Sequence, residues 1–210
     1  MKKLAVIFPG IGYHADKPLL YYARKLATEA GYEEQIKIEY TCTQKKIRGD
    51  EEKMRKAFEE LYAQAETALK DIRWEDYDDI LFISKSIGTI IATTYENRHL
   101  KDRHLQNNAS NLKQLLYTPL TATFNTTAIT ATTTTNTATA TATATTTSTI
   151  AFIGTADPWS NVPEVIALAR KNNIPIHVYD DANHSLETDD TIENLHIIRD
   201  VMKKSKIFMN

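Results

Sequence analysis

The 210-residue sequence predicts a three-layer α/β/α fold, in which a mostly parallel six-stranded sheet is covered by helices on both faces. Short apolar runs alternate along the chain with longer segments whose apolar residues follow helical spacing. The runs are apolar at consecutive positions, which is typical of strands that are buried on both faces. The length suits one domain, and we expect residues 1–210 to form a single one.

The N-terminal half contains three of the expected strands. Residues 4–8 form an apolar run that Pro9 and Gly10 break well short of a signal-peptide core, so we predict a strand followed by a glycine loop. Asp16 and Pro18 are typical of a helix start, with Asp16 as the cap. By the same criteria we expect further strands at 36–41 and 80–83, and a helix at 50–70.

The C-terminal half continues the alternation, with one exception. We expect strands at 113–117, 149–154 and 174–179, and helices at 161–171 and 189–204. Between Thr118 and Thr149, however, more than half of the residues are threonine, and alanine is the next most frequent. Threonine disfavours helix, and this tract holds almost no large apolar side chains, so we expect it to be extended or poorly ordered.

Composition limits the function classes. The net charge is −2 and the pI is near 6.3, so nothing suggests a nucleic-acid or membrane partner, and we expect a small-molecule partner instead. The single cysteine, Cys42, excludes an internal disulfide and any multi-cysteine metal site, which fits a reducing compartment. Since no apolar run approaches the length of a membrane span, we expect a soluble, cytoplasmic protein. The sequence does not predict its oligomeric state.

The segment Ser84-Lys85-Ser86-Ile87-Gly88 lies between an apolar run and a helical pattern. It differs by one residue from the nucleophile elbow Gly-x-Ser-x-Gly, in which a serine is exposed on a tight turn between a strand and a helix. Ser84 replaces the first glycine with another small residue. A serine in such a turn is more often structural, so the motif needs partners before it indicates catalysis.

Two further polar residues follow later predicted strands. Asp157 lies in Gly-Thr-Ala-Asp-Pro-Trp after the fifth strand, and His184 lies in Asn-His-Ser after the sixth. An open parallel sheet collects its ligands at the carboxyl ends of its strands, where Ser86 also lies. With this order of serine, aspartate and histidine the chain resembles the α/β-hydrolase superfamily, specifically its small bacterial esterase-like members. The resemblance covers the whole length except 118–149, which occupies the position of a cap.

The resemblance implies a serine hydrolase that cleaves a small carboxylic ester or related acyl bond. Ser86 would be the nucleophile, His184 the general base and Asp157 the acid that orients it. Asp180 or Asp181 remains an alternative for the acid. The oxyanion would be held by two backbone N–H groups, for which the resemblance implies Ile11 and Ile87. The acyl substrate is expected to contact Gly12, Tyr13 and Trp159, and the resemblance requires no metal or organic cofactor.

Three residues near this site have plainer interpretations. His14 lies in the oxyanion loop, but a solvated loop histidine is the more common case. Lys85 is expected mainly to follow from the turn, and Trp159 also suits packing of the Asp157 loop. A metal cluster at Asp180, Asp181 and His184 lacks further ligands at suitable spacing.

Two other functions remain open. The segment from Gly10 to Ala15 matches the dinucleotide fingerprint Gly-x-Gly-x-x-Ala, but Asp16 and Pro18 place the helix start after the glycines. The fingerprint also expects an acidic residue about 20 positions later, at the end of the next strand, whereas Glu39 lies in the middle of the expected strand. A second alternative is a hydrolase-like fold that only binds ligands, which Ser84 and the threonine tract would allow.

Overall fold

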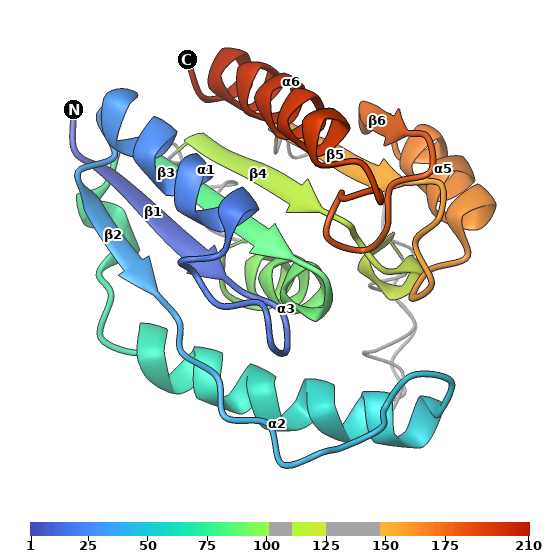
Figure 1. Cartoon of the computed structure of the whole chain (residues 1–210). Coiled ribbons are helices and arrows are strands. Elements are labelled where there is room, and N and C mark those ends of the chain that lie inside the picture. Colours follow the sequence, from blue (N-terminus) through green and yellow to red (C-terminus); the bar gives the residue numbers. More distant parts are fainter. Residues whose placement is uncertain (101–110, 125–147) are drawn as a thin grey trace.

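The computed structural model describes residues 1–100, 111–124 and 148–210. Within them a six-stranded, fully parallel sheet has the order β2-β1-β3-β4-β5-β6, which confirms the α/β class (Figure 1). The strands are β1 (Lys3–Phe8), β2 (Glu34–Lys37), β3 (Asp79–Lys85), β4 (Asn111–Tyr117), β5 (Ser148–Gly154) and β6 (Ile176–Tyr179). The strand order reverses direction between β1 and β3, and an open sheet binds its ligands at such a reversal.

Helices cover both faces of this sheet. The helices are α1 (Pro18–Glu29), α2 (Glu51–Leu69), α3 (Ile87–Tyr95), α5 (Val162–Lys171) and α6 (Thr191–Met209). Helices α1 and α6 lie side by side on one face, while α2 and α3 share a core with the other face (Figure 1). Short helical turns at Trp74–Asp76, Glu96–Leu100 and Thr121–Phe124 complete the regular structure of the described residues.

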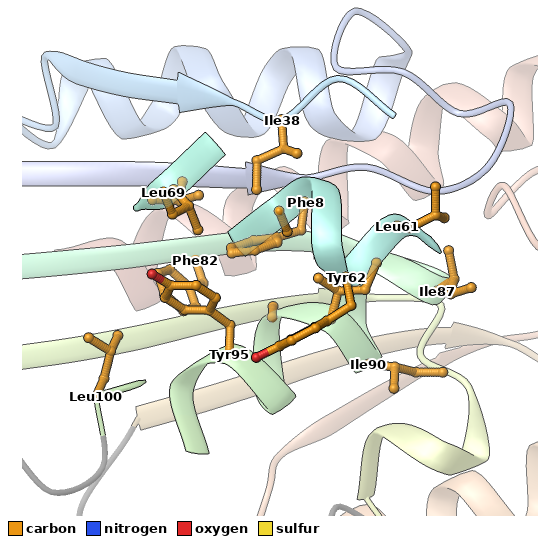
Figure 2. Packing of buried hydrophobic residues seen from close by; sticks show 14 of the residues in the cluster. Phe8, Ile38, Leu61, Tyr62, Leu69, Phe82, Ile87, Ile90, Tyr95 and Leu100 are labelled. Atoms are coloured by element: carbon orange, nitrogen blue, oxygen red, sulfur yellow. The ribbon is translucent and has the colours of Figure 1, made fainter. Parts of the chain in front are cut away.

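The two larger hydrophobic cores of the described residues, one on each face, follow from the alternation of side chains along buried strands. In β1, Leu4, Val6 and Phe8 belong to the core of α2 and α3, whereas Ala5 and Ile7 belong to the core of α1 and α6. Figure 2 shows the first of these cores, where Phe8 of β1 lies against Phe82 of β3 with ring centroids 4.9 Å apart. Both strands therefore need apolar residues at consecutive positions, as the sequence has them.

The second strand differs from the expected 36–41, because β2 ends at Lys37. The last bond of this ladder runs from the Ile38 N–H to the Ile7 carbonyl, at 3.1 Å. Pro9 follows β1 and has no N–H to donate, so the pairing stops there. The chain then crosses to α2, where Thr41 exchanges hydrogen bonds of 2.9 and 2.8 Å with the Gln64 side chain.

The expected cap of the first helix was wrong. Lys17 occupies the N-cap position of α1, and the Asp16 carboxylate pairs instead with Arg24, at 2.9 Å. The Leu19 N–H at the start of the helix donates to the hydroxyl of Tyr13, at 3.1 Å. A side chain from the glycine loop thus replaces the local cap, and it ties that loop to α1.

The last helix is longer than the expected 189–204, since α6 continues to Met209. Asp190 caps its start by accepting from the N–H groups of Ile192 and Glu193, at 2.7 and 3.1 Å. Ser205 and Met209 are buried near its end, where Ser205 shares a 2.8 Å hydrogen bond with Tyr117. Packing of this last turn against the sheet extends the helix beyond the predicted boundary.

Most of the threonine-rich tract lies outside the described residues, which include only 118–124 and 148–149 of it. Thr121–Phe124 forms a 3₁₀ turn, so the expectation of extended or poorly ordered chain is wrong there. The hydroxyls of Thr123 and Thr89 share a 2.7 Å hydrogen bond that fixes this turn to α3. No helix in the described part of the chain has both the length and the apolar character needed to cross a membrane.

Candidate active site

Ser86 lies at the tight turn between β3 and α3 and adopts φ 57° and ψ −129°. This positive φ is costly for a residue with a side chain and persists only where neighbouring structure holds it. The Ser86 N–H donates to the Tyr117 carbonyl at 3.0 Å, and the Ser86 carbonyl accepts from the Thr89 N–H at 2.9 Å. The end of β4 and the first turn of α3 therefore hold the strained serine in place.

The two ends of the Ser84–Gly88 segment have different structural roles. A Cβ atom on Gly88 would lie 2.2 Å from the Phe8 carbonyl oxygen, so α3 approaches the end of β1 only because this residue is glycine. Ser84, by contrast, lies within β3, and its buried hydroxyl donates to the Leu115 carbonyl of β4 at 3.0 Å. The turn therefore tolerates serine at the first small position and requires glycine at the last.

The structure brings Ser86, His184 and Asp157 into one hydrogen-bonded series. Ser86 Oγ lies 2.8 Å from His184 Nε2, and His184 Nδ1 lies 2.7 Å from Asp157 Oδ2. An ionised carboxylate only accepts, so Nδ1–H donates to Asp157 and Nε2 is left to accept the Ser86 proton. It is Asp157, rather than Asp180 or Asp181, that makes this bond in the structure.

Close contact between two loops places Asp157 against His184. A Cβ on Gly154, at the end of β5, would lie 2.0 Å from the Ala182 carbonyl oxygen. That oxygen also accepts from the Ala156 N–H, at 3.0 Å. The two loops after β5 and β6 thus share a backbone contact that sets the spacing of the acid and the base.

Burial shapes the electrostatics of this pair. The Asp157 side chain is fully buried, and its second oxygen accepts from the Trp159 N–H at 2.8 Å. The pKa of His184 lies below its ordinary value, chiefly because burial disfavours the imidazolium and also because of the nearby Lys85 ammonium, although Asp157 opposes the shift. A lowered pKa keeps the imidazole neutral near pH 7, which is the state that accepts a proton.

Lys85, expected mainly to follow from the geometry of the turn, also lines the pocket beside Ser86. Its side chain is buried, at 1 % exposed. The ammonium donates to Thr118 Oγ1 at 3.1 Å and lies 4.7 Å from the centre of the Tyr13 ring. Burial lowers the pKa of Lys85 to about 7, despite the opposing charge of Asp157. In the sequence, the only sign of this burial is the alternation of side chains along the strand, which puts residue 85 on the same face as Leu81 and Ile83.

Ser86 opens into a pocket of about 550 Å³. Its walls come from the loop after β1, the loop between β2 and α2, and the ends of the later strands. Gly12, Tyr13 and Trp159, expected to contact substrate, all line it together with His184. The Trp159 ring lies 5.8 Å from the His184 ring, inclined at 34°. Trp159 therefore both packs against the imidazole and forms part of the pocket wall.

The two expected oxyanion donors, Ile11 and Ile87, both line this pocket. Ile87 is the first residue of α3, where backbone N–H groups have no acceptor within the helix. Ile11 lies in a turn that the Tyr13 N–H closes by donating to the Gly10 carbonyl, at 3.2 Å. Ile87 directly follows the serine in the chain, and Ile11 reaches the same pocket from the loop after β1.

The alternative motifs occupy other environments. His14 lines a separate cavity between the ends of β1 and β2, and it does not line the pocket of Ser86. The glycines of the dinucleotide-like segment belong to the turn at Gly10, and α1 begins only at Pro18. In the described residues, no group of three or more His, Cys, Asp or Glu side chains is arranged to hold a metal ion.

Comparison with known proteins extends the description of the fold. No protein-family model and no curated protein matches the sequence. Among solved structures, the chain is similar to a protein from Agrobacterium vitis assigned as a hydrolase, with 12 % identity, TM-score 0.62, and coverage of 100 % of this chain and 88 % of that one. It is also similar to a protein from Xanthomonas campestris assigned to the alpha/beta hydrolase superfamily, with 14 % identity, TM-score 0.54 and coverage of 97 % and 98 %.

A third similar structure is an esterase from Pyrococcus furiosus, at 15 % identity and TM-score 0.55, with coverage of 100 % of this chain and 82 % of the esterase. These identities are low, and the likeness extends over nearly the whole chain in all three cases. The comparisons therefore support the fold resemblance that the sequence motifs indicated. The chain has an α/β-hydrolase-like fold.

Proposed function

We propose that this protein is a serine hydrolase that cleaves a carboxylic ester or a related acyl bond through an acyl-enzyme. The observation that carries the proposal is the unbroken hydrogen-bonded series from Ser86 through His184 to Asp157, in which Ser86 and His184 line a pocket. A hydroxyl is generally activated in this way: the nucleophile is hydrogen-bonded to a base, and the base is hydrogen-bonded to an acid that orients it. The similarity to hydrolase and esterase structures agrees with this chemistry.

In the first half-reaction, Ser86 Oγ attacks the carbonyl carbon while His184 Nε2 takes the hydroxyl proton. The tetrahedral intermediate then expels the alcohol, which leaves with that proton. Water next attacks the acyl-enzyme and gives a proton to His184, and the acid departs as Ser86 regains its proton. Asp157 keeps Nδ1 protonated throughout and stabilises the imidazolium that forms.

The oxyanion of the tetrahedral intermediate needs preorganised donors. We assign this role to the backbone N–H groups of Ile87 and Ile11, because both line the pocket next to Ser86. In other enzymes the loss of one such donor costs about 3 kcal/mol of transition-state stabilisation. Gly12, Tyr13 and Trp159 then form walls for the acyl or alcohol part of the substrate.

Covalent labelling tests the proposal. We expect intact-mass spectrometry to find one fluorophosphonate adduct on the wild-type protein, none on Ser86→Ala, and a strongly slowed reaction on His184→Ala. Ser160→Ala is the matched control, because Ser160 donates to the Pro119 carbonyl at 3.0 Å and does not line the pocket. A folded wild-type protein that forms no adduct, or an adduct that persists in Ser86→Ala, contradicts the proposal and favours a hydrolase-like binding protein.

A further inference from the structure

The pocket beside Ser86 is basic, although the protein as a whole carries a net charge of −2. Three cationic side chains line it, from Lys46, Arg48 and Lys85. Among the described residues that form its wall there is no aspartate or glutamate. Charges of one sign along a cleft raise the local concentration of ligands with the opposite charge.

Lys85 is buried, and its ammonium already has contacts inside the protein. Its ammonium donates to Thr118 and lies over the Tyr13 ring, and the charge of Asp157 acts on it. Lys46 and Arg48 differ, because both are exposed and neither forms an ion pair with an acidic side chain in the ranges that the structure describes. The positive charge available to a ligand therefore comes from these two residues.

The loop that carries both cations is anchored to the protein. Ile47 lies between them and is only 7 % exposed, in the core that α2 shares. Its carbonyl accepts from the Asp50 N–H at 3.1 Å, at the start of α2. Earlier in the loop, Thr43 donates its N–H and its hydroxyl to Glu60, each at 3.0 Å. Lys46 and Arg48 thus project from a fixed backbone on either side of a buried residue.

The position of Arg48 connects this loop to the proposed reaction centre. Its guanidinium carbon lies 6.0 Å from the centre of the Trp159 ring, and that ring lies 5.8 Å from His184. This distance is at the long end of the range for a cation–π contact, and the planar N–H groups of a guanidinium match the two oxygens of a carboxylate. Because Arg48 and His184 line the same pocket, a carboxylate bound by Arg48 would lie in the pocket that contains the base.

We propose that the preferred substrates are esters that carry a carboxylate elsewhere in the molecule, which Arg48 and Lys46 bind. This inference rests on the serine hydrolase function proposed above and adds the substrate class. The carboxylate of the substrate would supply the negative charge that Lys46 and Arg48 do not find in an acidic side chain of the described residues. Neutral esters fit the same pocket without that contact, and cationic esters are repelled.

A matched pair of substrates tests the preference. We would compare the 4-nitrophenyl monoester of adipic acid with its methyl-capped, neutral counterpart, following nitrophenolate release at low ionic strength. We expect kcat/KM to favour the anionic ester about tenfold, and about 1 M NaCl to remove most of this ratio, because the Debye length is then about 3 Å. Arg48→Gln and Lys46→Gln should each lower the ratio by up to about fivefold.

Lys45→Gln is the control for net charge, since Lys45 is exposed on the same loop but does not line the pocket. It should leave the ratio unchanged. The double variant Lys46→Glu with Arg48→Glu should invert the ratio in favour of the neutral ester. A wild-type ratio of one or below, or a ratio that the charge-reversed variant does not alter, overturns the proposal.

Binding to Ser86→Ala separates this inference from the proposed catalysis. We would titrate adipate and the neutral adipamide into Ser86→Ala by calorimetry, and repeat both with the charge-reversed double variant in the same background. Binding of adipate alone, lost on charge reversal, supports the anion site even where no ester is turned over. Equal or absent binding of the two ligands overturns it. Failure of the fluorophosphonate adduct on wild-type protein concerns only the proposed function.

Discussion

A Cβ atom on Gly154 would lie 2.0 Å from the carbonyl oxygen of Ala182, so the loops after β5 and β6 meet at a glycine. Asp157 follows three residues after this glycine, and His184 two residues after Ala182. The 2.7 Å contact between that acid and that base therefore depends on a backbone approach that no other residue allows.

Gly154→Ala should separate the two loops, because a methyl group cannot occupy 2.0 Å from a backbone oxygen. We expect the rate of fluorophosphonate labelling to fall at least about tenfold, since small displacements of catalytic groups are costly. We also expect overpacking to lower the free energy of unfolding by about 1–3 kcal/mol, measured in urea. Gly49→Ala controls for stability loss. Gly49 has φ 79° with no atom near its Cβ position, so it should lose stability through strain and keep the labelling rate.

Ser84→Gly restores the common form of the elbow, yet we expect it to harm the protein. The Ser84 hydroxyl is buried and donates to the Leu115 carbonyl, and glycine also weakens a strand interior. The free energy of unfolding should fall by about 1–2 kcal/mol with no faster labelling. Ser84→Ala removes only the hydrogen bond and should lose less. Equal stability of wild type and Ser84→Gly would show that the hydroxyl bond contributes nothing.

Asp157→Asn should lower kcat by about 10⁴, because an amide favours the wrong imidazole tautomer and leaves the imidazolium unstabilised. Steady-state kinetics on a nitrophenyl ester measures this loss. Asp181→Asn is the matched control. Asp181 has φ 57°, which asparagine tolerates, and its side chain is exposed, so we expect near-normal kcat. A comparable loss in Asp181→Asn would return the role of the acid to the loop after β6.

Lys85→Met should stabilise the protein, and more so at low pH. The pKa of Lys85 is about 7 in the folded state and near 10.5 when unfolded, so below pH 7 the folded protein bears the full cost of a buried ammonium. Between these values the folded state releases the proton first, and the cost falls as pH rises. The gain from Lys85→Met should therefore shrink by about 3 kcal/mol from pH 6 to pH 9, at about 1.4 kcal/mol per unit above pH 7. Urea unfolding of both proteins at the two pH values measures it.

The same substitution should move the acid limb of the activity profile. Burial holds the pKa of His184 below its ordinary value and the Lys85 ammonium adds to this, so loss of the charge raises that pKa. Labelling of Lys85→Met should then decline at a higher pH than labelling of wild type as the solution is acidified. An unchanged acid limb would mean that the Lys85 charge does not reach the imidazole.

The local pattern of the sequence was sufficient for the fold class and for grouping Ser86 and His184 with Asp157 as the preferred acid, while Asp180 and Asp181 stayed open. Consecutive apolar residues identify strands buried on both faces, and the turn that ends each strand is local in sequence. A parallel sheet brings the carboxyl ends of its strands to one edge. Together with the resemblance to the α/β hydrolases, this grouped Ser86, His184 and the candidate acids before any tertiary contact was known.

Tertiary packing determined the features that the local sequence pattern does not specify. The choice of Asp157 over Asp181 depended on the approach of Gly154 to Ala182, and the early end of β2 on its pairing with β1. Lys85 became a buried cation because the chain around it closes over its side chain. Arg48 reached the pocket from a loop anchored on α2, far from Ser86 in sequence. Burial and charge proximity arise from several segments at once, so they are properties of the folded chain and not of any single segment.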